Sequence, residues 1–269
     1  MAKKKIIGTC PMCTRTNQEI RVSHYVGRAI HRRCQVNGKG QILMTPQHVV
    51  ASERQLKAHL LCTDCEKRLN KYGDTPVFQL IDNRTSFPLR DKMNSGLAIG
   101  FPPMVGALRF SGISMAVNTD ALAYYALSFL WKGSVHRWPT VNGQTTGVDL
   151  GEYQEPTRQF LMGEAPFPKG ISVIVTASED YLSRGMAYVP HVVKHPTEKQ
   201  LSVLVHGVWF DVIFSDKDEW KEICCVQSPL KVLHLRNNED RMMLAGQRIQ
   251  RTAKVQPELA ERTPIITRP

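Results

Sequence analysis

Residues 60–68 read Leu-Leu-Cys-Thr-Asp-Cys-Glu-Lys-Arg, in which two cysteines join an apolar entry to a run of good helix formers. Cys62 and Cys65 have two residues between them, the spacing that lets two thiolates bind one tetrahedral zinc ion. Cys10 and Cys13 form a second pair with the same spacing. Because a structural zinc takes four protein ligands, the two pairs together predict one Zn²⁺ ion that staples the N-terminal region.

The compartment of the protein bears on these cysteines. Only Ile6 and Ile7 follow the basic start before Gly8, so no apolar signal segment is recognisable. The longest apolar helix candidate, residues 121–131, is too short to span a bilayer. The sequence therefore predicts a cytoplasmic protein without a membrane partner. Thiols stay reduced in that compartment, which favours a metal site over disulfides and leaves buried free thiols as the alternative.

The formal net charge of +11 over 269 residues is large. Such an excess favours a polyanionic partner, and we expect nucleic acid, DNA more than RNA, with a protein partner as a further option. Phosphate contacts are predicted for a basic group between the cysteine pairs, namely Arg28, His31, Arg32 and Arg33. The alternative for this group is a solvated charged face. A second basic stretch, residues 240–254, is predicted as a helix that either extends this surface or is simply exposed.

The pattern of apolar residues predicts the elements around the cysteines. Alternation of apolar and polar side chains predicts a strand over residues 19–26. An Asn-Gly turn within residues 36–40 leads into a possible returning strand over residues 41–44. Good helix formers follow the second cysteine pair over residues 66–72, and Gly73 is expected to end that helix.

A loop-rich bridge over residues 82–106 separates this region from a second one. There Thr119 and Asp120 form a capping pair before an apolar run that predicts a buried core helix over residues 121–131. An amphipathic helix and four strands are expected after it, at residues 152–162, 171–176, 186–193, 201–205 and 208–214. We therefore predict an α+β protein with a zinc-stapled domain over residues 1–90 and a larger mixed α/β domain over residues 91–269.

Several other cysteines and histidines have less specific signals. Three histidines are expected in loops or at the surface, namely His31, His48 and His59. Cys34 has no partner at the two-residue spacing and is kept only as an alternative zinc ligand. Cys224 and Cys225 are adjacent, and because neighbouring residues rarely chelate one ion, they are predicted to lie in the core.

The order of these motifs resembles the treble-clef proteins and, within them, the HNH nucleases that carry a four-cysteine zinc. Residues 10–13 match the first zinc knuckle of that family, residues 23–26 match its histidine-bearing strand, and residues 60–68 match its strand-to-helix knuckle. The resemblance implies a treble-clef, ββα-metal fold for this region. It also implies that His24 is the general base that activates water, since an imidazole can accept a proton near neutral pH.

Three positions depart from the pattern of that family, one of them Gly27, where the family frequently has proline. Ser23 stands where the family usually has Asp or Glu, and Glu66 stands where it usually has Asn or His. Asn70 lies four residues after Glu66 on the same helix face, so the resemblance implies a catalytic Mg²⁺ or Mn²⁺ ion near either side chain. The alternatives are that His24 packs on the zinc site and that Glu66 interacts with the helix dipole.

More loosely, the whole chain is similar to a group of uncharacterised bacterial zinc-knuckle proteins, through residues 127–132 and 148–151. The leading functional hypothesis is a metal-dependent nuclease that hydrolyses phosphodiester bonds of DNA or RNA, by family analogy in bacterial defence or a mobile element. The alternative is a non-catalytic zinc module that binds nucleic acid or a partner protein. A structural zinc domain that serves an activity of the second domain ranks last, because that domain shows no Walker loop, triad or dinucleotide motif.

Overall fold

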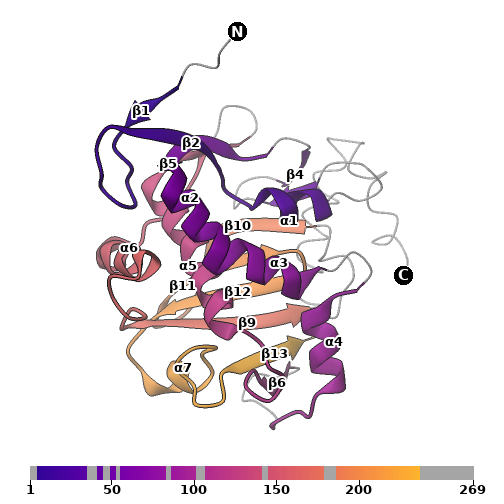
Figure 1. Cartoon of the computed structure of the whole chain (residues 1–269). Coiled ribbons are helices and arrows are strands. Elements are labelled where there is room, and N and C mark those ends of the chain that lie inside the picture. Colours follow the sequence, from indigo (N-terminus) through magenta and orange to yellow (C-terminus); the bar gives the residue numbers. More distant parts are fainter. Residues whose placement is uncertain are drawn as a thin grey trace.

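The computed structural model describes residues 5–34, 41–44, 49–52, 55–82, 86–100, 107–140, 145–178 and 186–236. Within these ranges the chain has a mixed α/β structure, as the sequence predicts, with two main sheets and a layer of helices (Figure 1). Four predictions lie outside the described residues, namely the turn at 36–40, the position of His48, the basic helix over 240–254 and the phosphate contacts expected from that helix.

A small antiparallel sheet carries the first part of the site. Its strand order is β1 (Ile7–Gly8), β2 (Gln18–His24) and β5 (Lys57–Cys62). The strand predicted over residues 19–26 is confirmed by β2. In the register of this sheet, Ile20 lies opposite Cys62 and His24 lies opposite Lys57. The sheet therefore places the end of β2 beside the start of β5, and the end of β5 at the second cysteine pair.

A long helical run follows Cys62 directly. It consists of α2 (Thr63–Leu69), a π-helical turn η1 (Asn70–Asp74) and α3 (Thr75–Ile81). The prediction that Gly73 ends the helix is wrong, because the helix continues through it. A side chain at Gly73 would begin 3.1 Å from the ring of Tyr124. Glycine is therefore retained here for close packing between helices, which outweighs its low helix propensity.

The predicted core helix is confirmed as α5 (Thr119–Val135). It is capped one residue earlier than expected, because the side chain of Asn118 accepts a hydrogen bond from the backbone N–H of Ala121 at 3.0 Å. The helix is buried along almost its whole length because it has neighbours on all sides. It contacts η1, α3 and α6 (Gln154–Met162), and it also contacts the large sheet through β9 (Ile171–Ser178) and β10 (Met186–Val193).

The large sheet has eight strands in the order β4-β3-β10-β11-β12-β9-β13-β6. The pairs β3–β10 and β9–β13 are parallel, and the remaining neighbours are antiparallel. All four strands predicted in the second region are present. The bounds of the strands not yet given are β3 (Gln41–Met44), β4 (Val49–Ser52), β6 (Ala107–Ser111), β11 (Lys199–Val205), β12 (Val208–Phe214) and β13 (Val232–Arg236).

The large sheet draws strands from both sides of residue 90. The strand predicted over residues 41–44 exists as β3, but it pairs with β10 of the second region through the register Ile42 opposite Met186. The division into residues 1–90 and 91–269 stays a prediction. What the structure shows is that strands from both predicted domains form one sheet.

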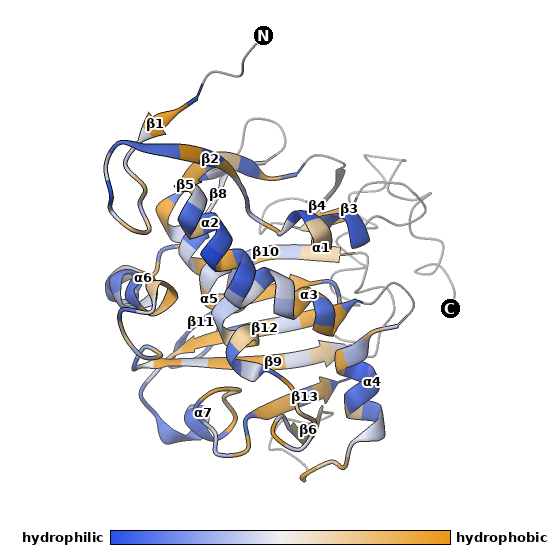
Figure 2. Ribbon diagram, viewed as in Figure 1, coloured by the Kyte–Doolittle hydropathy of each residue, from blue (hydrophilic) through white to orange (hydrophobic). Residues whose placement is uncertain are grey.

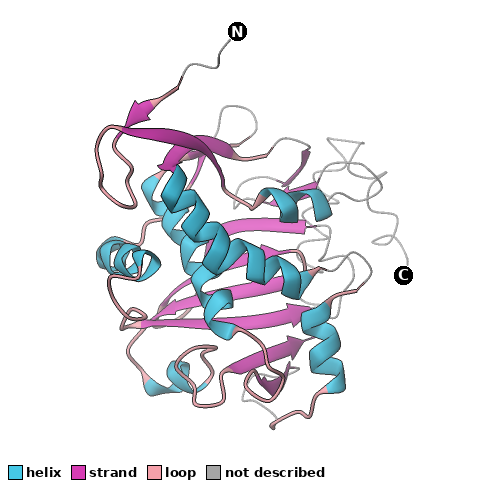
Figure 3. Cartoon of the chain, in the orientation of Figure 1, coloured by secondary structure: helices cyan, strands magenta, loops and turns pink. Residues whose placement is uncertain are grey.

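The remaining helices lie around these layers. The amphipathic helix predicted over residues 152–162 is confirmed by α6, which follows a 3₁₀ turn over Gly151–Tyr153. Figure 3 shows the helices gathered in front of the large sheet, and Figure 2 shows apolar residues along its central strands. Among the described residues, no helix is long and apolar enough to cross a membrane. The other short elements are α1 (Arg28–Arg33), α4 (Pro88–Ser95), α7 (Asp218–Glu222), β7 (Trp138–Pro139) and β8 (Thr145–Thr146).

Candidate functional site

The two cysteine pairs come together at one corner of the small sheet. Cys10 and Cys13 lie in the loop between β1 and β2, Cys62 ends β5, and Cys65 lies in the first turn of α2. Their four sulfur atoms all lie within 4.8 Å of one another, and the Sγ atoms of Cys13 and Cys62 are 3.8 Å apart. A tetrahedron with metal–sulfur bonds of about 2.3 Å has edges of about 3.8 Å. The cluster could therefore hold a metal ion with four sulfur ligands.

N–H groups around the cluster donate hydrogen bonds to the sulfur atoms of the first cysteine pair. The backbone N–H of Cys62 donates to Cys10 Sγ at 3.4 Å, and the Arg15 Nε donates to Cys13 Sγ at 3.4 Å. A hydrogen bond from Cys65 is the main cause that lowers the pKa of Cys10 to about 4, and the same contact raises the pKa of Cys65. Burial raises the pKa of Cys62. Arg15 is held in place by an ion pair with Asp64 at 2.7 Å. Such outer groups orient the ligands of a metal and offset their charge, and sequence analysis did not single out this pair.

Ser23 and Glu66 connect the small sheet to α2. The Ser23 hydroxyl donates to the carboxylate of Glu66 and accepts a hydrogen bond from the backbone N–H of Leu61 at 3.2 Å. Burial raises the pKa of Glu66, while the hydrogen bond from Ser23 opposes that change. Asn70, by contrast, is exposed. The two side chains, either of which was expected to hold a metal ion, thus differ in their surroundings, and their role as ligands stays a prediction.

His24 is the last residue of β2, and its side chain is half-buried. Among the described residues, its buried Nδ1 atom has no hydrogen-bond partner. Burial is the main cause that lowers its pKa, and the positive charges of nearby side chains add to the effect. The imidazole is therefore neutral at neutral pH, with a nitrogen able to accept a proton. The charged or titratable neighbours are Arg28, Lys132, Lys57 and His31.

Lys132 reaches the same place from α5. Only 4% of this residue is exposed, and its Nζ donates to the carbonyl oxygens of His24 at 3.0 Å and Tyr25 at 2.9 Å. The carboxylate of Asp74 in η1 is also buried nearby, where the charge of Lys132 partly offsets the rise that burial causes in its pKa. Sequence analysis assigned neither residue to the site. The sequence feature that could have indicated Lys132 is its position as a single lysine at the end of an apolar helix.

In comparisons with known proteins, no family model, no curated protein and no solved structure matches the chain. The likeness to HNH nucleases therefore rests on the motifs themselves. Of what that likeness implies, the structure supports a four-cysteine cluster that could hold a metal ion.

The predicted phosphate-binding residues lie on or beside α1, but they differ in accessibility. Arg28 and Arg32 are exposed and lie four residues apart, on one face of the helix. Arg33 forms an ion pair with the buried Asp82 at 2.6 Å. The prediction that His31 lies at the surface is wrong, because only 2% of it is exposed. The inward face of α1 buries His31, so this surface offers Arg28 and Arg32 to a partner.

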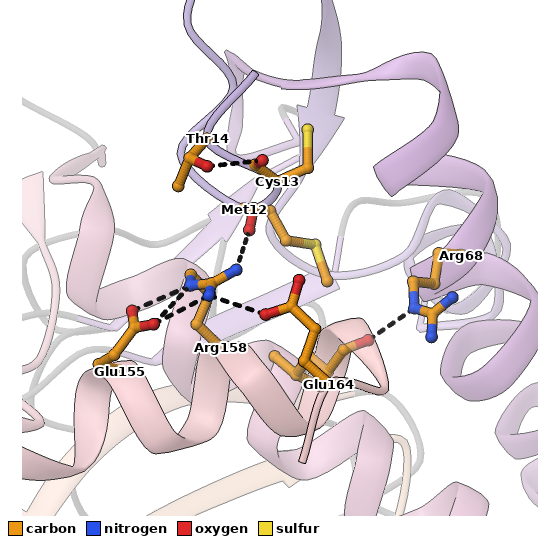
Figure 4. Close-up of polar contacts among 8 residues, drawn as sticks. Met12, Cys13, Thr14, Arg68, Glu155, Arg158 and Glu164 are labelled. Atoms are coloured by element: carbon orange, nitrogen blue, oxygen red, sulfur yellow. Dashed lines mark hydrogen bonds and ion pairs between the residues drawn. The ribbon is translucent and has the colours of Figure 1, made fainter.

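Both cysteine-bearing segments are also tied to α6. Arg158 donates to the carbonyl oxygen of Met12 at 2.7 Å, between the first two cysteines, and is held by Glu155 and Glu164 (Figure 4). Arg68 of α2 reaches the same helix, where its Nε donates to the carbonyl oxygen of Leu161 at 2.8 Å. Figure 4 shows Arg158 reaching from α6 to the first knuckle and Arg68 reaching α6 from α2. Sequence analysis missed both contacts, because exposed and bridging arginines look alike in a sequence.

Three further cysteines, Cys34, Cys224 and Cys225, do not belong to the four-cysteine cluster. Cys34 is buried, and its Sγ lies 3.7 Å from Nδ1 of His206 in the turn after β11. Burial raises the pKa of Cys34 to about 12, so it stays a thiol. Cys224 and Cys225 are buried, which confirms the prediction that they belong to the core. His59 is exposed on β5, as predicted.

Proposed function

We propose that this protein binds nucleic acid and hydrolyses its phosphodiester bonds, with His24 as the general base. The observation that carries the proposal is the half-buried, neutral imidazole among cationic side chains. In the register of the small sheet Lys57 lies directly opposite His24, and Arg28 begins the next helix. The positive charges of Arg28 and Lys57 can attract a phosphate group, while the neutral imidazole can take a proton from water.

The metal of the four-cysteine cluster is proposed to be zinc in a structural role. Four sulfur ligands complete a tetrahedral shell and leave no position for water, so this ion would hold the knuckles and not catalyse. The order knuckle, strand pair, knuckle and helix fits a treble-clef arrangement of this corner. In this reading the zinc keeps β2 in place and thereby sets the position of His24.

The proposed chemistry proceeds from a water molecule beside the phosphodiester. His24 accepts a proton from the water as its oxygen forms a bond to phosphorus, and the bond to the leaving ester oxygen breaks. The leaving oxygen takes a proton from solvent, and the imidazolium then returns its proton to solvent. Arg28 and Lys57 offset the charge that develops on the phosphate. A divalent ion near Glu66 does not fit this conformation well, because the carboxylate is half-buried and accepts a hydrogen bond from Ser23. No step is therefore assigned to such an ion.

Cleavage by a matched pair of variants tests the proposal. Purified wild type, His24→Ala and His59→Ala are incubated with single- and double-stranded DNA and RNA, with and without added Mg²⁺ or Mn²⁺. His59 is the control because it is an exposed histidine on the same small sheet. We expect His24→Ala to keep its bound metal and its affinity for nucleic acid but to lose about 10²–10⁴-fold in rate. Equal cleavage by wild type and His24→Ala would show that His24 is not the base.

The second candidate is a zinc module that binds nucleic acid without cutting it. The hydrogen bond between Ser23 and Glu66 favours this function, since it occupies the acidic side chain that a magnesium-dependent nuclease would use. In that case no nucleic acid is cleaved by any of the three proteins. Binding would persist, and it would weaken steeply with salt because phosphate contacts release counterions.

A further inference from the structure

We propose that Lys132 is a positioning residue for His24, which holds the end of β2 from the core helix α5. The proposal deepens the function proposed above for the same site. The claim that Lys132 holds the backbone at His24 does not require that the protein cleaves nucleic acid. The two can therefore be tested separately.

The contacts of Lys132 define what it can do. It is a buried lysine whose Nζ bonds two consecutive carbonyl oxygens, those of His24 and Tyr25. An ammonium group has three donors, and two of them are used here. Because the residue is only 4% exposed, it is too deep in the structure to meet a substrate directly. Its influence must pass through the backbone and the electric field at His24.

The carbonyl groups of His24 and Tyr25 lie where the chain leaves β2, and Lys132 supplies their hydrogen-bond donor. Strand β2 ends at His24, and α1 begins at Arg28, so the chain turns between them. The backbone N–H of Tyr25 still bonds the carbonyl oxygen of Leu56 at 2.9 Å. A buried carbonyl without a donor is costly, and Lys132 supplies the donor for two of them. The direction in which the imidazole leaves the chain is thereby fixed.

Asp74 supports the same turn from the helical run. One of its carboxylate oxygens is buried and has no hydrogen-bond partner among the described residues. The carboxylate faces Gly27, where an added Cβ would lie 3.4 Å from its Cγ. A buried carboxylate without hydrogen bonds is costly unless a positive charge compensates it. Burial raises the pKa of Asp74, and the positive charge of Lys132 opposes that rise. The turn at 24–27 thus lies between the ammonium group of Lys132 and the carboxyl group of Asp74.

The field of Lys132 also acts on the imidazole. His24 faces Arg28 and His31 from α1, Lys57 from β5 and Lys132 from α5, and all of these charges disfavour the imidazolium form. Arg28 and Lys57 lie at the surface, where salt screens them. Lys132 is buried, so its effect on the protonation of His24 should persist at high salt.

The direct test measures the titration of the His24 ring by NMR in Lys132→Met, Lys132→Gln and Lys92→Met. Lys92 is the matched control, because its Nζ also bonds a backbone carbonyl, that of Met115 at 3.0 Å, but on α4. We expect the pKa of His24 to rise toward its ordinary value in both Lys132 variants, at low and at high salt, and to stay unchanged in Lys92→Met. Lys132→Gln keeps a donor without the charge, so it serves if Lys132→Met does not fold.

Metal content and thermal unfolding are measured in each Lys132 variant. They show whether Lys132 positions His24 or only stabilises the fold. A variant that loses stability while the pKa of His24 stays at its wild-type value would overturn the proposal. If both Lys132→Met and Lys132→Gln fold and both keep the wild-type pKa of His24, the case against the proposal is stronger. Lys132→Arg, which keeps charge and donors, should restore most of the wild-type titration.

Activity provides the last readout. If wild type cleaves nucleic acid, we expect Lys132→Met to lose on the order of 10²-fold in kcat with little change in KM, because a displaced base still permits binding. Lys132→Arg should recover part of that loss. If wild type cleaves nothing, the proposed hydrolysis fails, and the titration of His24 still decides whether Lys132 positions it.

Discussion

His24 and His234 both lie in surroundings that lower the pKa of the imidazole, but they differ in depth. His24 stays half-buried at a strand end, whereas only 2% of His234 on β13 is exposed. Burial is the main cause that lowers the pKa of His234 to about 4, and the charge of Arg109 adds to it. A neutral histidine at the surface can accept a proton from a reacting group. A neutral histidine in the core makes the fold sensitive to acid.

We expect the free energy of unfolding to fall as the pH drops from about 6.5 toward 4. The sign follows from the lowered pKa, because in this window the unfolded chain binds a proton at His234 that the folded chain does not. The loss would be about 2–3 kcal/mol at the acid end. Urea unfolding at several pH values measures it in wild type and in His234→Gln, with the exposed His59→Gln as control. An equal pH dependence in wild type and His234→Gln would contradict the assignment.

At the level of single side chains, the sequence predicted some members of the site and not others. The cysteines were predictable because their spacing follows from the geometry of a metal ion, and the structure brings their sulfur atoms together. Lys132 and Asp74 were not predictable as members of the site. Their partners come from β2, and no local pattern shows which lysine of an apolar helix will reach a distant strand end.

At the level of elements, the sequence pattern predicted the core helix α5, helix α6 and the strands from β9 to β12, but not short elements such as α1, α4 and β13. A further error arose where tertiary packing overrode local preference. The helix after Cys65 was expected to end at Gly73, yet it continues through a π-helical turn into α3. Glycine is a usual helix terminator in isolation. Here its lack of a side chain allows the helix to approach Tyr124 and Tyr125 of α5 closely. Packing between two helices cannot be seen in the sequence of one.

A larger residue at Gly73 should therefore destabilise the protein. Gly73→Leu would force the two helices apart, at a cost of about 1–3 kcal/mol, which exceeds the gain in helix propensity. The control is Gln79→Leu, an exposed position on the following α3 helix, where the same residue is introduced without a close neighbour. Thermal unfolding compares the two. A Gly73→Leu protein as stable as the control would show that the helices can separate at no cost.

At the scale of the whole molecule, the cysteine cluster is connected to parts of the chain that lie beyond residue 90. Arg158 holds the first knuckle, Arg68 joins α2 to α6, and Lys132 joins α5 to the end of β2. The predicted boundary between two domains thus lies in a region where many contacts cross. We infer that metal binding stabilises the whole fold and not the N-terminal region alone.

The tryptophans allow this inference to be tested, since all of them follow residue 90, namely Trp131, Trp138, Trp209 and Trp220. Removal of metal by a chelator should lower the unfolding midpoint reported by tryptophan fluorescence, and added Zn²⁺ should restore it. Arg158→Ala should reduce this dependence on metal. Arg21→Ala is the control, because Arg21 pairs with Glu19 on the small sheet. If the chelator leaves the midpoint from tryptophan fluorescence unchanged, the cysteine cluster and the part of the chain after residue 90 unfold independently.

The position of β3 has a consequence for how the chain matures during synthesis. All four cysteines of the cluster, which could hold a metal ion, lie within the first 65 residues, so a nascent chain could bind such an ion early. Strand β3, made soon after the first knuckle, has β10 as a parallel neighbour, with Ile42 opposite Met186. That pairing must wait until the ribosome has produced most of the chain. Contacts of such high sequence separation form late and slowly. A metal ion bound early would therefore keep the region around the four cysteines compact until β10 is made and can pair with β3.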